Sequence, residues 1–284
     1  KKNLALIEAT KNHNKVVAFY LFKKKKFQNQ EAQKWWGGKS LDEFEKKLST
    51  LNINLEIIQT DTYKFFFENL FNKNNFSIYW NRTYEPDYLE FDKYLSKNFK
   101  TKNIYFKIFK GNILNEFNEV KKNDGTPFKV FTPFWRTAEK IYLALPPSKN
   151  NIVKKQSQIK SFFKNCINPN DILPKKNWYK KFESYWNVSE NDSKKILNNL
   201  IANKIKDYGT ARDYPSIEGT SKLSPYIKHG QIHVNTIWNK CKEMKSKGIG
   251  YRKYINELGW REFSHSLINY FPEFLKGNYR KEFD

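Results

Sequence analysis

The chain has 284 residues, enough for one large domain or two ordinary ones, with 39% hydrophobic and 17% aromatic residues and a formal net charge of +23. This composition excludes a disordered tail, and no apolar run approaches the roughly 20 residues of a membrane span. Two cysteines exclude a disulfide framework, and no secretory segment opens the chain, so we expect a cytoplasmic protein whose positive field favours nucleic acid.

Helices and strands alternate over the first 110 residues. Periodic apolar positions predict helices at 1–13, 40–53, 62–75 and 86–99, the second capped by Ser40, and apolar runs predict strands at 15–22, 54–61, 76–81 and 103–109. Such alternation favours a parallel sheet covered by helices. Because a sheet of this kind normally begins with a strand, we expect its first strand to be missing from the chain.

The pattern changes after Gly111. Turn signals and aromatic residues follow without sustained periodicity, and the proline-bearing stretch at 139–188 predicts a long connecting loop. Helices are predicted at 189–209, capped by Ser189 and ended by Gly209, and again at 234–244 and 254–270. We therefore predict an α/β plus all-α protein, with an α/β domain at 1–118, a linker at 119–188 and a helical domain at 189–284.

Arginine is scarce among the basic residues of this chain. Of 52 lysines and arginines only six are arginine: Arg82, Arg136, Arg212, Arg252, Arg261 and Arg280. Where lysine replaces arginine so widely, a retained arginine indicates a position that needs the planar guanidinium, such as bidentate pairing with a carboxylate or a phosphate.

The segment "GTSKLSPYIKHG", which begins at Gly219, is rich in hydroxyl and turn-forming residues. Thr220, Ser221 and Ser224 offer hydroxyl donors, and the turn at Gly219 leads into a predicted helix whose first amides are free. This combination suits a phosphate or a pyrophosphate. The ordinary alternative is a helix N-terminus capped by serine.

The segment "ELGWREF" places an acid, an indole and a guanidinium on one helix face. Glu257, Trp260 and Arg261 stand at i, i+3 and i+4 and suit a flat, hydrogen-bonding ligand near a phosphate, such as a nucleobase. The alternative is a Glu257–Arg261 ion pair beside a core tryptophan. His229 and His233 also stand four apart, but no third ligand is near, so we predict no metal site.

Four stretches together resemble one known family. "YWNRTYEP", "FKVFTPFWR", "YGTARDYPSIEGTSKLSPYIKHG" and "NELGWREF" are similar, in order and spacing, to the DNA photolyase/cryptochrome family, above all to the class I cyclobutane pyrimidine dimer photolyases. The resemblance covers the chain essentially from end to end. It implies a Rossmann-like antenna domain, a long linker and the first part of a helical FAD domain, so that the chain is truncated at both ends and inactive by itself.

The resemblance also implies roles for individual residues. The expected FAD contacts are Tyr208, Thr220, Ser221, Lys222, Leu223, Ser224 and Tyr254. Glu257 and Trp260 match the acid and the indole that receive the flipped-out dimer, and Arg212 and Arg261 match positions beside the DNA. Glu85 resembles a residue near the antenna chromophore, which would be methenyltetrahydrofolate or a deazaflavin.

The implied activity is light-driven repair of cyclobutane pyrimidine dimers by electron transfer from reduced FAD, in a monomer that binds UV-damaged DNA. Two alternatives stay open. A cryptochrome-type photosensor shares the scaffold and the cofactor, but Glu257 with Trp260 favours repair. A nucleic-acid-binding module without flavin would explain the charge alone.

Overall fold

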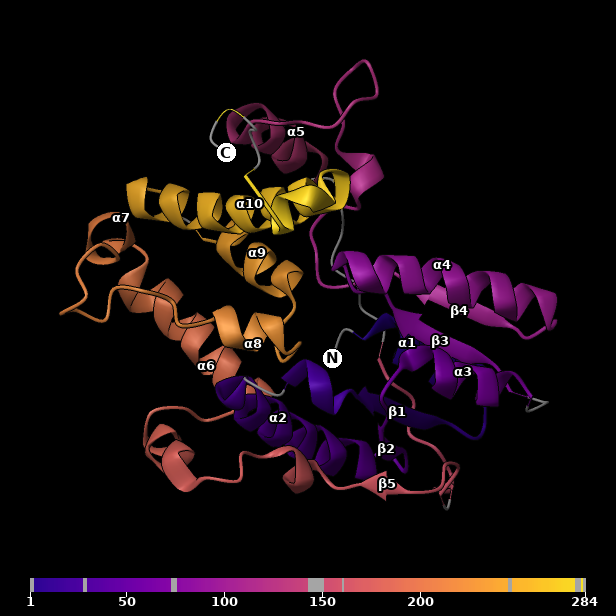
Figure 1. The fold of residues 1–284 in the computed structure, drawn as a ribbon. Helices are drawn as coiled ribbons and strands as arrows, with labels where there is room; N and C mark the ends of the chain where they lie inside the picture. Colours follow the sequence, from indigo (N-terminus) through magenta and orange to yellow (C-terminus); the bar gives the residue numbers. More distant parts are fainter. Residues whose placement is uncertain are drawn as a thin grey trace. The chain divides into compact units, whose positions relative to one another are not determined.

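The computed structural model describes residues 3–27, 30–72, 76–142, 151–159, 161–244, 247–278 and 282 (Figure 1). The chain forms two compact units that are discontinuous in sequence. Unit 1 comprises Lys1–Asn81, Tyr94–Phe109 and Lys149–Ser193, and unit 2 comprises Arg82–Lys93, Lys110–Ser148 and Lys194–Asp284. Within the described residues, no helix combines the length and the apolar character that a membrane crossing requires.

Unit 1 contains the strands. β1 (Val17–Phe22) and β2 (Asn54–Gln59) run parallel, and the short β5 (Cys166–Ile167) adds antiparallel to β2. β3 (Ile78–Asn81) and β4 (Phe106–Phe109) also run parallel, but in a separate two-stranded sheet. The mixed α/β character and the four predicted strands are therefore confirmed, whereas the single parallel sheet is divided into two.

The helices of unit 1 begin close to the predicted positions, with one exception. They are α1 (Leu4–Asn12), α2 (Glu31–Ser49), α3 (Tyr63–Phe71) and the part of α4 (Pro86–Thr101) from Tyr94 on, with 3-10 turns at Lys24–Phe27, Pro169–Ile172 and Asn177–Ser184. The prediction that Ser40 caps a helix was wrong, because α2 begins nine residues earlier. Trp35 and Trp36 are buried in its first turns and contact Phe182 and Trp186 edge-on, and this burial sustains the helix through two glycines.

Two small apolar clusters hold the layers of unit 1 together. Residues of α1 and α2 pack on the strand region in the first, which comprises Leu6, Ala9, Val16, Leu48 and Ile53. The second joins β1 and β2 to the turn after β5 through Phe22, Ile57 and Ile172. A short segment of the predicted linker thus completes the α/β unit, which its polar composition did not indicate.

Unit 2 is helical. Its elements are η2 (Phe117–Glu119), α5 (Phe131–Tyr142), α6 (Glu190–Asn199) from Lys194 on, the π-helical turn η5 (Leu200–Lys204), α7 (Tyr208–Ala211), α8 (Ser224–Lys228), α9 (Val234–Lys242), α10 (Ile249–Tyr270) and η6 (Pro272–Leu275). α10 packs against α5, α7 and α9, and Figure 1 shows it between α5 and α9. α5 lies in the stretch for which the sequence predicted no helix.

The core of unit 2 forms where α5, α9 and α10 meet. Trp135 of α5 contacts Trp238 of α9 edge-on, with 5.6 Å between ring centroids, and a Cβ atom at Gly259 of α10 would lie 2.5 Å from the Trp135 ring. Only glycine fits there, so α5 and α10 approach closely. Cys241 of α9 is fully buried, and burial raises its thiol pKa to about 12.

The helix predicted at 189–209 is interrupted. Ser189 caps it as expected, since its Oγ accepts a hydrogen bond from the Asp192 amide at 3.1 Å. The regular helix nevertheless ends at Asn199 and passes into a π-helical turn, and Gly209 lies inside α7 instead of ending a helix. A Cβ atom at Gly250 of α10 would lie 2.1 Å from the Ile205 carbonyl oxygen and 2.4 Å from that of Lys206. α10 therefore approaches the backbone closely at the turn between η5 and α7.

Candidate functional site

An ion pair joins α7 to α10. Nη1 of Arg212, the C-cap residue directly after α7, contacts Oε1 of Glu257, and the guanidinium also lies 5.4 Å from the centroid of the Tyr208 ring. The Glu257 carboxylate raises the pKa of Arg212, and both side chains remain partly exposed. The structure therefore brings together two residues that the sequence assigned separately to DNA and to the dimer. It does not form the alternative pair between Glu257 and Arg261.

Two buried tyrosines, one on α7 and one on α10, pack against each other. Tyr208 and Tyr254 meet edge-on, with 5.1 Å between centroids and 86° between planes, and their exposed fractions are only 6% and 3%. Burial raises the pKa of both phenols, and a hydrogen bond with Ser221 opposes that rise at Tyr254. Both rings are therefore neutral and provide an apolar wall beside the loop at 219–224.

That loop is anchored at both of its ends. A Cβ atom at Gly219 would lie 2.1 Å from the Ala211 carbonyl oxygen, so only glycine allows this approach of loop to α7, and Leu223 is 1% exposed. Between them Lys222 adopts a left-handed conformation with φ of 54°, which is uncommon for a residue other than glycine. The anchored turn keeps the hydroxyl side chains of Thr220 and Ser224 at the surface.

The loop does not form the ordinary serine-capped helix start. α8 begins at Ser224 with Leu223 in the capping position, and no side chain there accepts a capping hydrogen bond. Lys222 pairs with Glu218 at 2.5 Å, and Lys204 lies 3.5 Å from the same carboxylate. Three hydroxyl groups and a cation thus lie within five consecutive residues, a donor set suited to an anion.

Trp260 is a surface residue of α10. Its exposed fraction is 47%, so it lies outside the core that the described residues form. One face of the indole lies flat on Phe131 of α5, with 3.8 Å between centroids and 8° between planes. Phe131 stands in the stretch "FKVFTPFWR", which contributed to the family resemblance, yet sequence reasoning assigned it no role because the contact joins residues 129 positions apart.

Arg261 points away from Glu257 and Trp260. Its Nη1 lies 2.7 Å from Oε1 of Glu262, and its Nη2 donates to the Asn112 carbonyl oxygen at 2.7 Å. Glu262 is 4% exposed and also accepts a hydrogen bond from the Leu114 amide at 2.6 Å. Burial raises the pKa of Glu262, whereas Arg261 acts to lower it. This buried acid, which the sequence did not single out, ties α10 to the chain segment after β4.

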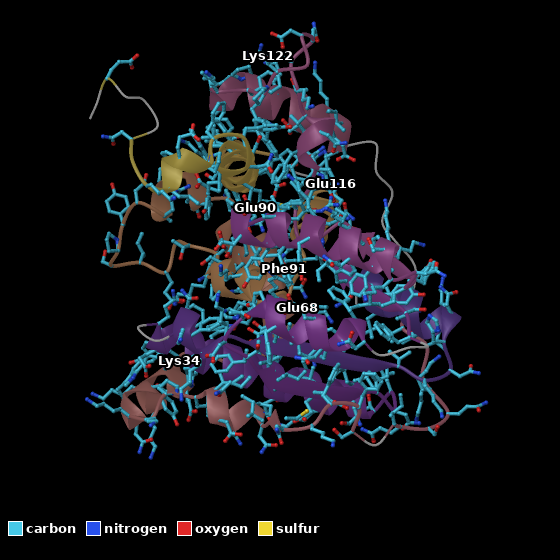
Figure 2. The ribbon with its side chains drawn as sticks, turned by 45° about the vertical axis from the view of Figure 1, so that its right-hand side comes forward. Lys34, Glu68, Glu90, Phe91, Glu116 and Lys122 are labelled. Atoms are coloured by element: carbon cyan, nitrogen blue, oxygen red, sulfur yellow. The ribbon has the colours of Figure 1, made fainter. Side chains whose placement is uncertain are left out.

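Glu85 lies apart from these residues, against the end of α8, where it pairs with Lys228 at 3.0 Å. Close to it in sequence, Arg82 and Tyr84 both donate to Glu116, which is labelled in Figure 2, at 3.2 and 2.8 Å. In the part of the chain that the structure describes, no group of three or more histidine, cysteine or acidic residues could hold a metal ion.

Two half-buried histidines predict an acid-sensitive unit 2. Burial lowers the pKa of His229 and His265 to about 4, and Lys228 near both and Arg261 near His265 act in the same direction. In the unfolded chain the pKa of a histidine is higher, about 6.5. The free energy of unfolding therefore has its full value above pH 6.5 and decreases as the pH falls toward 4, by on the order of 2–3 kcal/mol for each histidine.

The measurement is urea unfolding of the purified protein at pH 7 and pH 5. We expect His265→Gln to reduce the loss between the two pH values. A loss of the same size in the wild type and the variant would contradict the assignment to His265.

Comparison with known proteins places these features in a family. The family model described as DNA photolyase matches residues 1–152, more than half of the chain. The chain belongs to the DNA photolyase family. A protein named deoxyribodipyrimidine photo-lyase from Agrobacterium fabrum is 28% identical over 99% of this chain and 59% of its own length. The chain thus spans about three-fifths of that relative.

Solved structures of photolyases share this fold. A bacterial class III photolyase from Agrobacterium tumefaciens superimposes with a TM-score of 0.85 at 26% identity, over 99% of this chain and 59% of its own. An archaeal photolyase from Sulfolobus tokodaii, whose structure contains two FAD molecules, has a TM-score of 0.70 at 19% identity and the same coverage. The family predicted from the sequence is confirmed, and the structural likeness is to a class III member where class I was expected.

Proposed function

We propose that the protein containing this chain binds FAD and uses light to repair cyclobutane pyrimidine dimers in DNA. The observation that carries the proposal is the surface of α10 around Glu257 and Trp260. One helical turn separates a carboxylate from a half-exposed indole, so a flat base that stacks on the indole can donate its N–H groups to the acid.

The loop at 219–224 fits a phosphate-bearing cofactor. Hydroxyl groups of Thr220, Ser221 and Ser224 surround the turn at Lys222, and Tyr208 and Tyr254 supply the neutral wall next to Ser221. We assign these residues and Leu223 to FAD. Reduced FAD, when bound, supplies the light-excited electron that splits the dimer. The residues of this chain bind and orient it.

Removing two hydroxyl groups from this loop should weaken flavin retention. Thr220→Ala combined with Ser224→Ala removes two exposed hydrogen-bond donors, each worth about 0.5–1.5 kcal/mol, so we expect the flavin dissociation constant to rise about tenfold. The measurement is the ratio of flavin to protein absorbance through purification and dialysis of the full-length protein. Ser49→Ala with Thr50→Ala, two exposed hydroxyl residues at the end of α2, is the control, and equal retention in both double variants would count against the assignment.

The arginines of unit 2 support DNA as the partner. Arg82, Arg212, Arg252 and Arg261 each pair with a carboxylate. Arg136, on the exposed face of α5, forms no ion pair with any residue the structure describes, and neither does Lys140 one turn later. A guanidinium and an ammonium at i and i+4 that lack a carboxylate suit two phosphates of a nucleic-acid backbone.

The roles of the residues in recognition follow from this geometry. Trp260 offers its open face to a base, and Glu257 accepts hydrogen bonds from N–H groups of the base edge. Arg212 orients Glu257 before DNA binds. As a residue beside the DNA, Arg212 can then leave this ion pair and bind a phosphate instead. Lysine–phosphate contacts make the overall affinity strongly dependent on salt.

Repair should depend on the charge of Glu257. Glu257→Gln keeps the shape of the side chain, but it loses the ion pair with Arg212 and half of its acceptor capacity, so we expect the repair yield per absorbed photon to fall severalfold while flavin content is unchanged. The measurement is dimer loss in an irradiated oligonucleotide with the full-length protein, and Glu243→Gln, an exposed acid directly after α9, is the control. If the flavin-loaded wild type itself repaired no dimers, the result would indicate a photosensor instead.

A further inference from the structure

The stack between Phe131 and Trp260 is unlike the aromatic contacts around it. The two rings are parallel, at 8°, with centroids 3.8 Å apart. Phe263 contacts the same two rings steeply, at 66° to Phe131 and 68° to Trp260. A parallel stack at this distance blocks that face of the indole to any other ring, which steep contacts do not.

Phe131 is held in place by the packing of α5. It is the first residue of that helix, and Phe134 and Trp135, which follow within one turn, are each 3% exposed. Phe134 packs on Phe263 with 5.2 Å between centroids, and Trp135 lies against Gly259, the residue before Trp260. The ring of Phe131 therefore stands on a close, rigid contact between α5 and α10.

We propose that Phe131 is a positioning residue that fixes the plane of the Trp260 indole so that a single base of the nucleic acid stacks on its opposite face. The inference rests on the proposed function. Phe131 occupies one face, so the exposed 47% of Trp260 belongs to the other face and to the ring edges. A base can then stack on one side only.

This arrangement also lowers the cost of binding. A half-exposed tryptophan without a neighbour samples several rotamers, and freezing them on binding opposes the gain from stacking. With Phe131 in place the indole already has the orientation that the base requires, one helical turn from Glu257. Removing the phenyl ring should therefore weaken recognition of the dimer, although Phe131 itself does not touch the nucleic acid.

The test compares full-length variants on two duplexes, one with a cyclobutane dimer and one intact. Phe131→Leu removes the ring and keeps an apolar side chain, Phe131→Tyr keeps the ring, and Val130→Ala is the control because Val130 is exposed next to Phe131. We expect Phe131→Leu to lower affinity for the damaged duplex about three- to tenfold. Affinity for the intact duplex should change less than twofold, and Phe131→Tyr and Val130→Ala should match the wild type on both.

A second measurement reports the indole directly. With 5-fluorotryptophan in place of tryptophan, the fluorine resonance that disappears in Trp260→Phe belongs to Trp260, and its ring-current shift should move in Phe131→Leu and stay in Phe131→Tyr. An unmoved resonance, or undiminished damage recognition in Phe131→Leu while Trp260→Ala loses it, would overturn the inference and leave the proposed function standing. If Trp260→Ala lost equal affinity for the damaged and the intact duplex, both the inference and the proposed function would be overturned.

Discussion

Replacing Trp260 with alanine should lower the affinity of the full-length protein for dimer-containing DNA by about tenfold or more, and leave its affinity for intact DNA nearly unchanged. Stacking of one base on an aromatic side chain is typically worth roughly 1–3 kcal/mol, which corresponds to about five- to 150-fold in affinity. Intact DNA keeps its bases in the helix and is bound through phosphates, which Trp260 does not contact. A paired titration of the two duplexes at one salt concentration measures both values.

Trp178 provides the matched control. It is 40% exposed, close to the value for Trp260, but it lies in the 3-10 turn Asn177–Ser184 of unit 1 and stacks edge-on with Phe182. Trp178→Ala should bind both duplexes like the wild type. If Trp260→Ala weakened binding to damaged and intact DNA equally, the indole would serve only the packing of α10 on α5.

Replacing Glu262 with alanine should lower the free energy of unfolding by about 3–5 kcal/mol, the usual cost of removing one partner of a buried ion pair. The substitution leaves the partly buried guanidinium of Arg261 without its carboxylate and the Leu114 amide without its acceptor. It also opens a cavity in a region where burial is nearly complete. Urea unfolding of wild type and variant at pH 7, with the slope compared as well as the midpoint, measures the loss.

Two further variants separate the causes. Glu262→Gln keeps the shape and an acceptor oxygen, so it should lose less than alanine does. Glu139→Ala breaks the pair with Arg252, a guanidinium that is 54% exposed, and should cost at most about 1 kcal/mol. A loss of that small size in Glu262→Ala would mean that the buried pair does not hold α10 to the segment after β4.

Local patterns were sufficient for much of the secondary structure. The four strands from Val17 to Phe109 carry enough apolar side chains in short runs to be predicted from those runs, and their parallel pairing follows from the helices between them. α5 was missed because its core residues, such as Phe134 and Trp135, lie in a stretch crowded with turn-forming residues. Its buried residues nevertheless recur at helical spacing, at positions 134, 135, 138 and 142.

Local sequence predicts neither the early start of α2 nor the break after Asn199. Gly37 and Gly38 weaken a helix in isolation, yet burial of Trp35 and Trp36 outweighs the intrinsic cost of about 1 kcal/mol for each glycine. The apolar stripe after Ser189 predicts a continuous helix, but the close approach of α10 at Gly250 falls on the turn that follows the break. In α2, tertiary burial therefore outweighs local helix propensity.

The sequence by itself determined the family, the α/β and helical parts, and the residue types of the candidate site, because the motifs around Gly219 and Trp260 are continuous stretches of chain. Only the tertiary structure decided what each side chain contacts. It paired Glu257 with Arg212 instead of Arg261, turned Arg261 toward a buried acid, and placed Phe131 flat against Trp260. Two of these contacts join residues that are 45 and 129 positions apart, and the third joins Arg261 to one of several acids within its reach. The packing of α5, α7 and α10 decides which contacts form, and local sequence does not encode that packing.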